Sequence, residues 1–318
     1  MKNRGKYLIS IDGGGTKTGI CVYDTQLDAM VTDVCGGGNY KVHGAETVRN
    51  RIMESLRKLL PDSADIPSET KFLVMGLSGC DAPQDEAVYA DMMTEAGFPR
   101  KLMFICNDSE LIFRSLADEP GICTIAGTGT IALSFETGGK VRRAGGWGAP
   151  LSDDGSGYWI AAEMVRHFLA WIDGLDRFDP FFDRILSAYS GKSPEETAAF
   201  LGAQPPDFIA DWAKTVMDEA ENNELCRDIV STAGRKTAFL TASVYGKSNF
   251  AALDSIKIVE SGSLFKNALY ETEFRKALSE LFPLCNYEIV RSDAAPAEDG
   301  IRLARKLSEG LLSTRSQD

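Results

Sequence analysis

The chain has 318 residues, of which 44% are hydrophobic and 25% charged, and its formal net charge is −12. This composition predicts a globular protein of one large or two ordinary domains, whose core needs no disulfide or structural metal. The acidic balance argues against nucleic acid or an anionic membrane as a partner. Seven scattered cysteines without a C-x-x-C pair, no visible signal peptide and no run of 18 apolar residues favour a cytoplasmic location.

The first 116 residues are predicted to form an α/β domain, because hairpin-like strands are followed by alternating strands and helices. The strands are short apolar runs that end in glycine or polar residues, and the helices carry apolar residues at helical spacing. In chain order, the expected elements are strands at 6–10 and 19–23 joined by a wide turn at 13–17, a third strand before a glycine loop at 36–39, a helix at 45–60, a strand at 71–79, a helix at 86–96, a strand at 101–108 and a helix at 109–116.

The pattern restarts at Gly121, where "GICTIAGTGTIALSFE" repeats the strand, glycine turn and strand of "LISIDGGGTKTGICVYD" about 115 residues further on. We interpret this as an internal duplication of one functional element. The second domain is expected to span 117–318, with a helical insertion at about 159–248 and with the last helix as a candidate to pack back on the first domain. The expected elements after the hairpin are a loop at 145–158, a helix at 159–171, a largely helical block at 173–246, a strand, turn and helix at 255–278, and a closing strand and helix.

The first glycine turn is suited to binding an anion. Its backbone N–H groups can converge on phosphate oxygens, since glycine allows close approach and positive φ angles. Asp12 ends the preceding strand, where its carboxylate can hold Mg²⁺ directly or through water. The spacing is not that of a Walker A loop, and a strand rather than a helix follows, so an ordinary hairpin is the alternative. The turn residues are Gly13, Gly14, Gly15, Thr16 and Lys17.

Two further glycine turns are candidates for contacts with a nucleotide. The turn "GTGT" offers the same cradle without the acid or the lysine, and two such turns could grip a polyphosphate from both sides of a cleft. The turn in "ESGS", between a strand and a helix, is a plausible seat for an adenine ring, with a plain β–α turn as the alternative. The residues concerned are Gly127, Thr128, Gly129, Thr130, Gly262 and Ser263.

Asp108 is the candidate catalytic base. It ends a buried strand and should therefore emerge at a carboxyl edge, where ligands collect in α/β sheets. A carboxylate at that edge can accept the proton of a hydroxyl that attacks a γ-phosphorus. The alternative is that Asp108 only caps the helix expected from Ser109.

Amides, hydroxyls and carboxylates on several loops predict a site for a polyol. Asp153 and Asp154 lie in a loop rich in glycine and serine that opens a helix, where one of them could serve as a cap. Two adjacent acids in such a loop fit better with binding sugar hydroxyls or the water shell of a metal. Asn39 and the pair Ser78–Gly79 lie on other loops expected at the same edge.

Taken together, the chain resembles the N-acetylglucosamine kinase type of sugar kinase in the BadF/BadG/BcrA/BcrD ATPase family. That family belongs to the superfamily of actin, hexokinase and heat-shock-chaperone ATPases. The resemblance spans nearly the whole chain. It rests on "IDGGGTKT" at the first turn, "GGGN" at 36–39, "GLSG" at 76–79, "ND" at 107–108, "AGTGT" at 126–130, "GGWG" at 145–148, "DDGSGYWIA" at 153–161, "SGS" at 261–263 and "PAEDGIRLA" near the end.

The resemblance implies two ribonuclease H-like domains of the actin and hexokinase type, with ATP and a sugar in the cleft between them. It implies Mg²⁺ near Asp12, phosphates on both glycine turns and Asp108 as the base. The reaction would be the phosphorylation of N-acetylglucosamine, glucosamine or a related hexose at the 6-hydroxyl. The implied sugar contacts are Asn39, Ser78, Gly79, Asn107, Gly145, Gly146 and Asp153.

Two departures from the family pattern concern the sugar. Where "GDEGS" is expected the chain has "SDDGS", and Ile131 follows "GTGT" where N-acetylglucosamine kinases tend to carry a polar residue. Glucosamine or another hexose therefore stays open as the substrate. The alternatives are an ATPase activator of an acyl-CoA dehydratase, for which Cys35 could be one iron–sulfur ligand, and a non-catalytic sugar-binding regulator. We also expect a homodimer.

Overall fold

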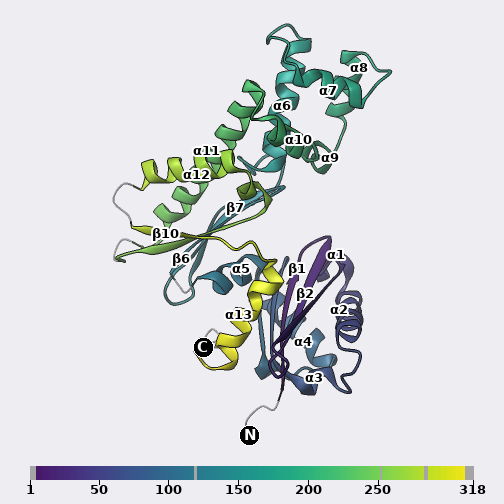
Figure 1. The fold of residues 1–318 in the computed structure, drawn as a ribbon, viewed down its shortest axis with the longest axis vertical. Helices are drawn as coiled ribbons and strands as arrows, with labels where there is room; N and C mark the ends of the chain where they lie inside the picture. The colour runs from purple at the N-terminus through teal and green to yellow at the C-terminus, as the bar shows by residue number, and fades with distance from the viewer. Residues whose placement is uncertain (1–4, 118–119, 251–252, 283–285, 312–318) are drawn as a thin grey trace. The chain divides into compact units, whose positions relative to one another are not determined.

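The computed structural model describes residues 5–117, 120–250, 253–282 and 286–311. The chain folds as two compact units, which are described here one at a time (Figure 1). The first comprises Met1–Glu119 together with Val290–Asp318, and the second comprises Pro120–Ile289. The C-terminal helix therefore belongs to the first unit, although most of the chain after residue 116 belongs to the second.

The first unit is built on a five-stranded sheet with the order β3-β2-β1-β4-β5. Strands β1, β2 and β3 are antiparallel neighbours, whereas β4 and β5 continue the sheet parallel to β1. Parallel strands need crossover connections, which the helices between β3 and β5 supply. The strands are β1 (Tyr7–Gly13), β2 (Lys17–Asp24), β3 (Ala29–Gly36), β4 (Thr70–Leu77) and β5 (Met103–Cys106).

Helices cover both faces of this sheet, so its central strands are buried on both sides. In β1, Ile9 and Ile11 belong to one core cluster and Leu8 to another, as the alternation of side chains along a strand requires. The first cluster includes residues of α2 and α4, and the second includes residues of α5 and α13. The helices are α1 (Tyr40–His43), α2 (Ala45–Leu59), α3 (Ile66–Glu69), α4 (Pro83–Glu95), the 3₁₀ turn η1 (Arg100–Leu102), α5 (Asp108–Leu116) and α13 (Pro296–Ser308).

The second unit repeats this sheet, with the order β10-β9-β6-β7-β8. Its first three strands are again antiparallel neighbours, and β9 runs parallel to β6. The duplication inferred from the two glycine turns therefore corresponds to matching sheets. The strands are β6 (Gly121–Ala126), β7 (Thr130–Phe135), β8 (Val141–Gly145), β9 (Ile256–Ser261) and β10 (Tyr287–Val290).

A large helical insertion separates β8 from β9. Figure 1 shows α11 and α12 beside the second sheet and the shorter helices α7 to α10 grouped around α6. Gly234 of α11 lets the two long helices approach closely, because an alanine Cβ there would lie 3.1 Å from the backbone nitrogen of Phe274 in α12. The helices of the insertion are α6 (Gly157–Ile172), α7 (Phe181–Ala188), α8 (Pro194–Gly202), α9 (Pro206–Ala210), α10 (Trp212–Glu219) and α11 (Glu224–Lys247). The 3₁₀ turn η2 (Ser263–Lys266) and α12 (Ala268–Leu281) follow β9.

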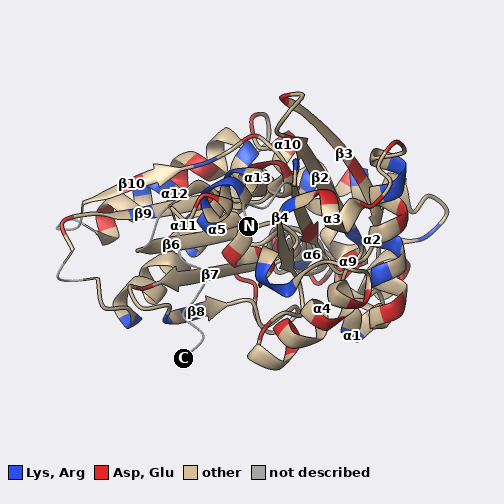
Figure 2. Cartoon of the chain, turned by 90° about the horizontal axis from the view of Figure 1, so that it is seen from below, with Lys and Arg blue, Asp and Glu red and all other residues tan. Residues whose placement is uncertain are grey.

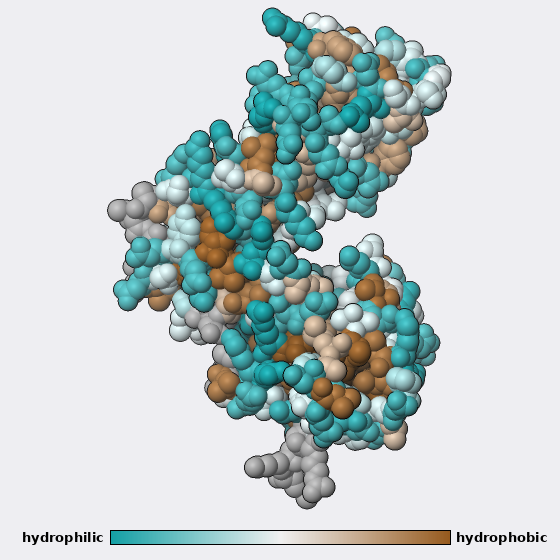
Figure 3. Space-filling model, viewed as in Figure 1, coloured by the Kyte–Doolittle hydropathy of each residue, from teal (hydrophilic) through white to brown (hydrophobic). Residues whose placement is uncertain are grey.

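The surface carries the charged residues that the composition of the chain predicts. Figure 2 shows basic and acidic residues mixed along the helices, and Figure 3 shows a mostly hydrophilic face with smaller apolar patches on both units. Within the described ranges, no helix is both long enough and apolar enough to cross a bilayer.

Candidate active site

The carboxyl ends of β1, β4 and β5 meet at one edge of the first sheet, because these strands are parallel. Asp12 lies near the end of β1, Ser78 follows β4, and Asp108 follows β5. The backbone N–H of Ser78 donates to the carbonyl oxygen of Gly13 at 2.7 Å, which joins the loop after β4 to the first glycine turn. The topology thus brings three predicted site loops to one edge.

The first turn is shorter than the sequence predicts, because β1 extends to Gly13 and β2 begins at Lys17. The N–H of Gly14 donates to the carbonyl oxygen of Lys17 at 2.8 Å, which closes a narrow hairpin instead of a wide one. The segment after β3 contacts this hairpin at two points. The N–H of Gly38 donates to the carbonyl oxygen of Gly14 at 2.9 Å. In α1, Nε2 of His43 lies 3.0 Å from the carbonyl oxygen of Gly15. Gly15, Thr16 and Lys17 are exposed, as binding an anion requires.

Two carboxylates share this edge, and both have raised pKa values. Burial raises the pKa of Asp12 to about 7, the negative charge of Asp108 adds to this rise, and Lys17 opposes it. Burial also raises the pKa of Asp108, against the stabilising hydrogen bond from the N–H of Ser109 at 2.8 Å. A pair of partly desolvated carboxylates with little positive charge beside it is a donor set that suits a hard divalent cation such as Mg²⁺.

Asp108 is the first residue of α5, and the cap of this helix is Asn107. The Oδ1 atom of Asn107 accepts from the N–H of Ser109 at 3.0 Å, and its Nδ2 donates to Oδ1 of Asp81 at 3.1 Å. The alternative in which Asp108 itself caps the helix is therefore wrong in detail, because the neighbouring asparagine has that role. Asn107 uses its side chain for this cap and for its bond to Asp81.

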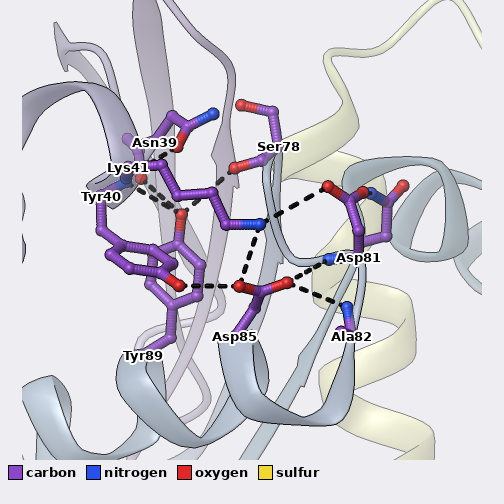
Figure 4. Close-up of polar contacts among 10 residues, drawn as sticks. Asn39, Tyr40, Lys41, Ser78, Asp81, Ala82, Asp85 and Tyr89 are labelled. Atoms are coloured by element: carbon purple, nitrogen blue, oxygen red, sulfur yellow. Dashed lines mark hydrogen bonds and ion pairs between the residues drawn. The ribbon is translucent and has the colours of Figure 1, made fainter. Parts of the chain in front are cut away.

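Asn39 and Ser78 lie together on the first unit (Figure 4), and Gly79 adjoins the side chain of Asn39. Gly79 has a φ of 84°, and an alanine Cβ there would lie 2.8 Å from both Oδ1 and Nδ2 of Asn39, so glycine lets the asparagine amide lie directly on the backbone. The Ser78 hydroxyl is buried and has no hydrogen-bond partner within the described part of the chain. An unpaired buried hydroxyl beside a side-chain amide is a ready contact for a hydroxylated ligand.

The second glycine turn, residues 127–130, contacts the N-terminal end of helix α6. The N–H of Gly127 donates to the carbonyl oxygen of Gly129 at 2.9 Å, which closes the turn. The N–H of Gly157 donates to the carbonyl oxygen of Gly127 at 2.8 Å, so helix α6 holds the turn in place. Thr128 is exposed, whereas Thr130 is buried in β7 and its hydroxyl donates to the carbonyl oxygen of Asp154 at 3.0 Å. The Thr130 hydroxyl is therefore already used in a hydrogen bond within the protein.

Asp153 lies directly beside this turn. It has a positive φ of 69°, which among non-glycine residues is adopted mainly by Asn, Asp and His, and it is buried with only 8% of its surface exposed. Its Oδ2 would lie 2.9 Å from a Cβ at residue 129, so Gly129 is needed for the close approach. Burial raises the pKa of Asp153, and its Oδ1 has no partner among the residues that the structure describes. Backbone hydrogen bonds at Thr130 and Gly148 oppose this rise in pKa, and the carboxylate keeps one oxygen without a partner among the described residues, as a ligand contact requires.

Gly145 and Gly146 also adjoin the second turn. Both have positive φ angles, of 72° and 67°, and the N–H of Gly146 donates to the carbonyl oxygen of Thr130 at 2.8 Å. An alanine Cβ at residue 146 would lie 2.7 Å from Cδ1 of Ile131. The departure at Ile131 therefore concerns the immediate neighbour of a predicted sugar contact.

A pocket of about 540 Å³ in the second unit brings together the turns at 127–130 and 262–263. Gly262 has a φ of 103° and lies against the backbone of Ala126, so no side chain fits there. Helices α9 and α10 form one wall of this pocket; the sequence indicated a helical block larger than two sheets require and left open whether it forms a cleft wall or a dimer interface. The lining residues are Gly127, Thr128, Gly157, Ala210, Asp211, Ala213, Lys214, Met217, Asp218, Ser263, Leu264, Lys266 and Asn267.

The cysteines give no support for an iron–sulfur cluster. Of the six described cysteines, five are buried, and only Cys35 is partly accessible. The described residues contain no group of three or more histidine, cysteine or acidic side chains placed to hold a metal ion. Cys285 lies outside the described residues.

Comparison with known proteins gives consistent matches over most of the chain. An N-acetylmuramic acid/N-acetylglucosamine kinase of Clostridium acetobutylicum is 24% identical over 294 residues, covering 91% of this chain and 96% of that protein. An N-acetyl-D-glucosamine kinase of Dictyostelium discoideum is 30% identical over 171 residues, covering 51% and 54%.

Among solved structures, one assigned to an N-acetylglucosamine kinase of Chromobacterium violaceum has a TM-score of 0.71 at 19% identity, covering 95% of this chain and 99% of that one. This likeness, with the two matching five-stranded sheets, confirms the predicted fold class of two actin- and hexokinase-type α/β domains. The sequence pattern of the BadF/BadG/BcrA/BcrD ATPase family matches residues 9–298, and the chain belongs to that family.

Proposed function

We propose that this protein is an ATP-dependent sugar kinase that phosphorylates an amino sugar or a related hexose. The observation that carries the proposal is the edge of the first sheet, with Asp108, Asp12 and the first glycine turn. The amide of Asn39 and the Ser78 hydroxyl, which has no partner among the described residues, belong to loops at the same edge. Such an edge can hold a hydroxylated substrate beside a base and a phosphate. The named kinases among the relatives support the same reaction class. N-acetylglucosamine and glucosamine are the first candidates, with the 6-phosphate as product.

In this reaction Asp108 accepts the proton of the attacking sugar hydroxyl, whose oxygen forms a bond to the γ-phosphorus of ATP as the bond to ADP breaks. The raised pKa of Asp108 supports the role, because it brings the carboxylate closer to the basicity that proton transfer needs. The exposed amides of the first turn would bind phosphate oxygens. Most of the rate enhancement would come from positioning and charge stabilisation.

Asp12 is the residue that would hold Mg²⁺, directly or through water. Its carboxylate is partly buried beside a second acid, and a bound divalent cation would relieve the repulsion between the two. When bound, the ion neutralises charge on the ATP phosphates.

The pocket of the second unit is the proposed site for the nucleoside and part of its phosphate chain. It is concave, it contains both a glycine turn and the "SGS" turn, and its volume suits a nucleoside. Gly127 and Thr128 would contact phosphate, and Gly262 and Ser263 would adjoin the adenosine. A homodimer and a cytoplasmic location stay predictions.

The test is a coupled ADP-release assay on N-acetylglucosamine, glucosamine, N-acetylmuramic acid, N-acetylmannosamine and glucose, each with a matched reaction without sugar. We expect ADP release that depends on one or more amino sugars, and a product whose 6-oxygen carries the phosphate by NMR. Sugar-independent ATP hydrolysis with no phosphorylated product would refute the kinase and favour the ATPase alternative.

A further inference from the structure

Two loops carry the predicted sugar contacts of the first unit, and one helix bonds to both. Asn39 follows β3 and caps α1, whereas Ser78 follows β4. Helix α4 lies beneath both loops, and two of its residues, Asp85 and Tyr89, are one turn apart and buried (Figure 4). We call this pair the Asp85–Tyr89 clamp.

Asp85 uses one carboxylate oxygen for each loop. Its Oδ1 accepts from the hydroxyl of Tyr40 at 2.7 Å and lies 2.9 Å from Nζ of Lys41, both next to Asn39. Its Oδ2 accepts from the backbone N–H groups of Asp81 and Ala82 at 3.1 and 3.0 Å. These bonds cap the N-terminus of α4 and hold the end of the loop that begins at Ser78. Hydrogen bonds from Tyr40 and Lys41 lower the pKa of Asp85 to about 2, so the carboxylate stays charged at any ordinary assay pH.

Tyr89 makes a second connection between the same loops. Its hydroxyl lies 3.0 Å from the carbonyl oxygen of Gly38 and 3.2 Å from that of Ser78, and it accepts from the N–H of Tyr40 at 3.2 Å. The rings of Tyr40 and Tyr89 pack edge to face, with centroids 5.1 Å apart. The phenol therefore fixes the backbone on both sides of the predicted sugar contacts.

We propose that Asp85 and Tyr89 are positioning residues that hold Asn39 and Ser78 at the separation required by the sugar. This inference rests on the proposed function. Neither residue needs to touch the sugar, because both act through the loops they join. A displacement of about 1 Å in such groups can cost as much as a hundredfold in activity. The Ser78 hydroxyl, which has no partner in the described ranges, can bond to a sugar only if its loop is held in place.

The test compares Asp85→Asn and Tyr89→Phe with the wild-type enzyme on the sugar that it phosphorylates best. Asparagine keeps the shape of Asp85, and its amide oxygen can still accept from Asp81 and Ala82. Its NH₂ group cannot accept from Tyr40 or Lys41, so the ion pair with Lys41 is lost and the Tyr40 hydroxyl can only accept where it now donates. The exchange therefore weakens the connection to the Asn39 loop and spares the other one. We expect the KM for the sugar to rise about tenfold or more in both variants, with the KM for ATP within about twofold of wild type.

Two control variants and one milder variant make the result specific. Asp91→Asn removes an exposed acid from the same helix, and Tyr189→Phe removes a phenol hydroxyl from the second unit; both should leave the sugar KM unchanged. Tyr40→Phe deletes only the hydroxyl that reaches Asp85, so it should fold even if Asp85→Asn does not, and we expect a smaller rise in sugar KM.

The outcomes separate the two proposals. If the wild-type enzyme phosphorylates a sugar while Asp85→Asn, Tyr89→Phe and Tyr40→Phe keep its sugar KM, only the positioning role is overturned. An equal rise in the KM for ATP would show a general structural defect and would also overturn it. If the wild-type enzyme phosphorylates no sugar, the proposed function fails, and the clamp inference fails with it.

Discussion

Asp108 and Asp12 lie at one edge with raised pKa values, yet their proposed roles differ. Asp108→Asn removes the proton acceptor and keeps the shape of the side chain, including an oxygen that can accept from Ser109. We expect kcat to fall by about 10²- to 10⁴-fold, with nucleotide affinity nearly unchanged. Steady-state kinetics and calorimetric titration with ADP measure the two quantities. An equal loss of both would contradict the base role.

The buried carboxylate of Asp153 should lower the free energy of unfolding at neutral pH. Burial raises its pKa in the folded state above the unfolded value, so the folded protein binds the proton more tightly and the charged form is penalised. This penalty is absent below the unfolded pKa and fully present above the folded one. Asp153→Asn should therefore increase the free energy of unfolding at neutral pH, by up to about 1 kcal/mol, with a gain that shrinks as the pH falls through the folded pKa.

Asparagine also tolerates the positive φ at this position, so the exchange adds no backbone strain. Chemical denaturation at several pH values measures the effect. Asp154→Asn is the matched control, because Asp154 is the next residue, is exposed and pairs with Lys236 at 3.3 Å. A stability gain in the control but not in Asp153→Asn would contradict the argument, and sugar phosphorylation should fall only in Asp153→Asn.

At the scale of elements, the strands and their polar ends could be predicted because their signal is local. Apolar runs that end in "GLSG" or "ND" indicate buried strands of a parallel sheet, and such strands place their ends at one edge. The Asp85–Tyr89 clamp could not be predicted, since its hydrogen bonds join residues 45 and 49 positions apart. The role of the helical block as a cleft wall or as a dimer interface stayed open for a similar reason: amphipathic spacing indicates a buried face but not which pocket it borders.

The turn after β9 gives a prediction at the element scale. Gly262 has a φ of 103° and lies against the backbone of Ala126, so Gly262→Ala combines conformational strain with a steric clash. We expect a loss of about 1–3 kcal/mol of stability, and a rise in the KM for ATP with little change in that for the sugar. Gly246→Ala in α11 is the control, since nothing lies within 4 Å of a Cβ there. A Gly262→Ala enzyme with normal ATP kinetics would remove this turn from the nucleotide site.

At the scale of the whole molecule, two units with the same sheet order each carry their own set of candidate binding residues. The first unit has the acids, the first turn and the clamped loops. The second has the pocket, the second turn and Asp153. Sheet topology explains why both sets lie at corresponding sheet edges, although their sequences share little beyond a glycine turn between apolar strands. The assignment of each ligand to its unit can therefore be tested without altering a residue.

Hydrogen exchange measured by mass spectrometry, with each ligand added alone, makes this test. ADP should slow exchange in 210–218 and 263–267, which form the pocket wall and the turn after β9. The sugar should slow exchange in 38–41 and 78–82, because a ligand on Asn39 and Ser78 would suppress local opening of the loops that the clamp joins. If ADP protected 38–41 and 78–82 while leaving 210–218 and 263–267 unchanged, the nucleoside would belong to the first unit, and the assignment of the pocket would be wrong.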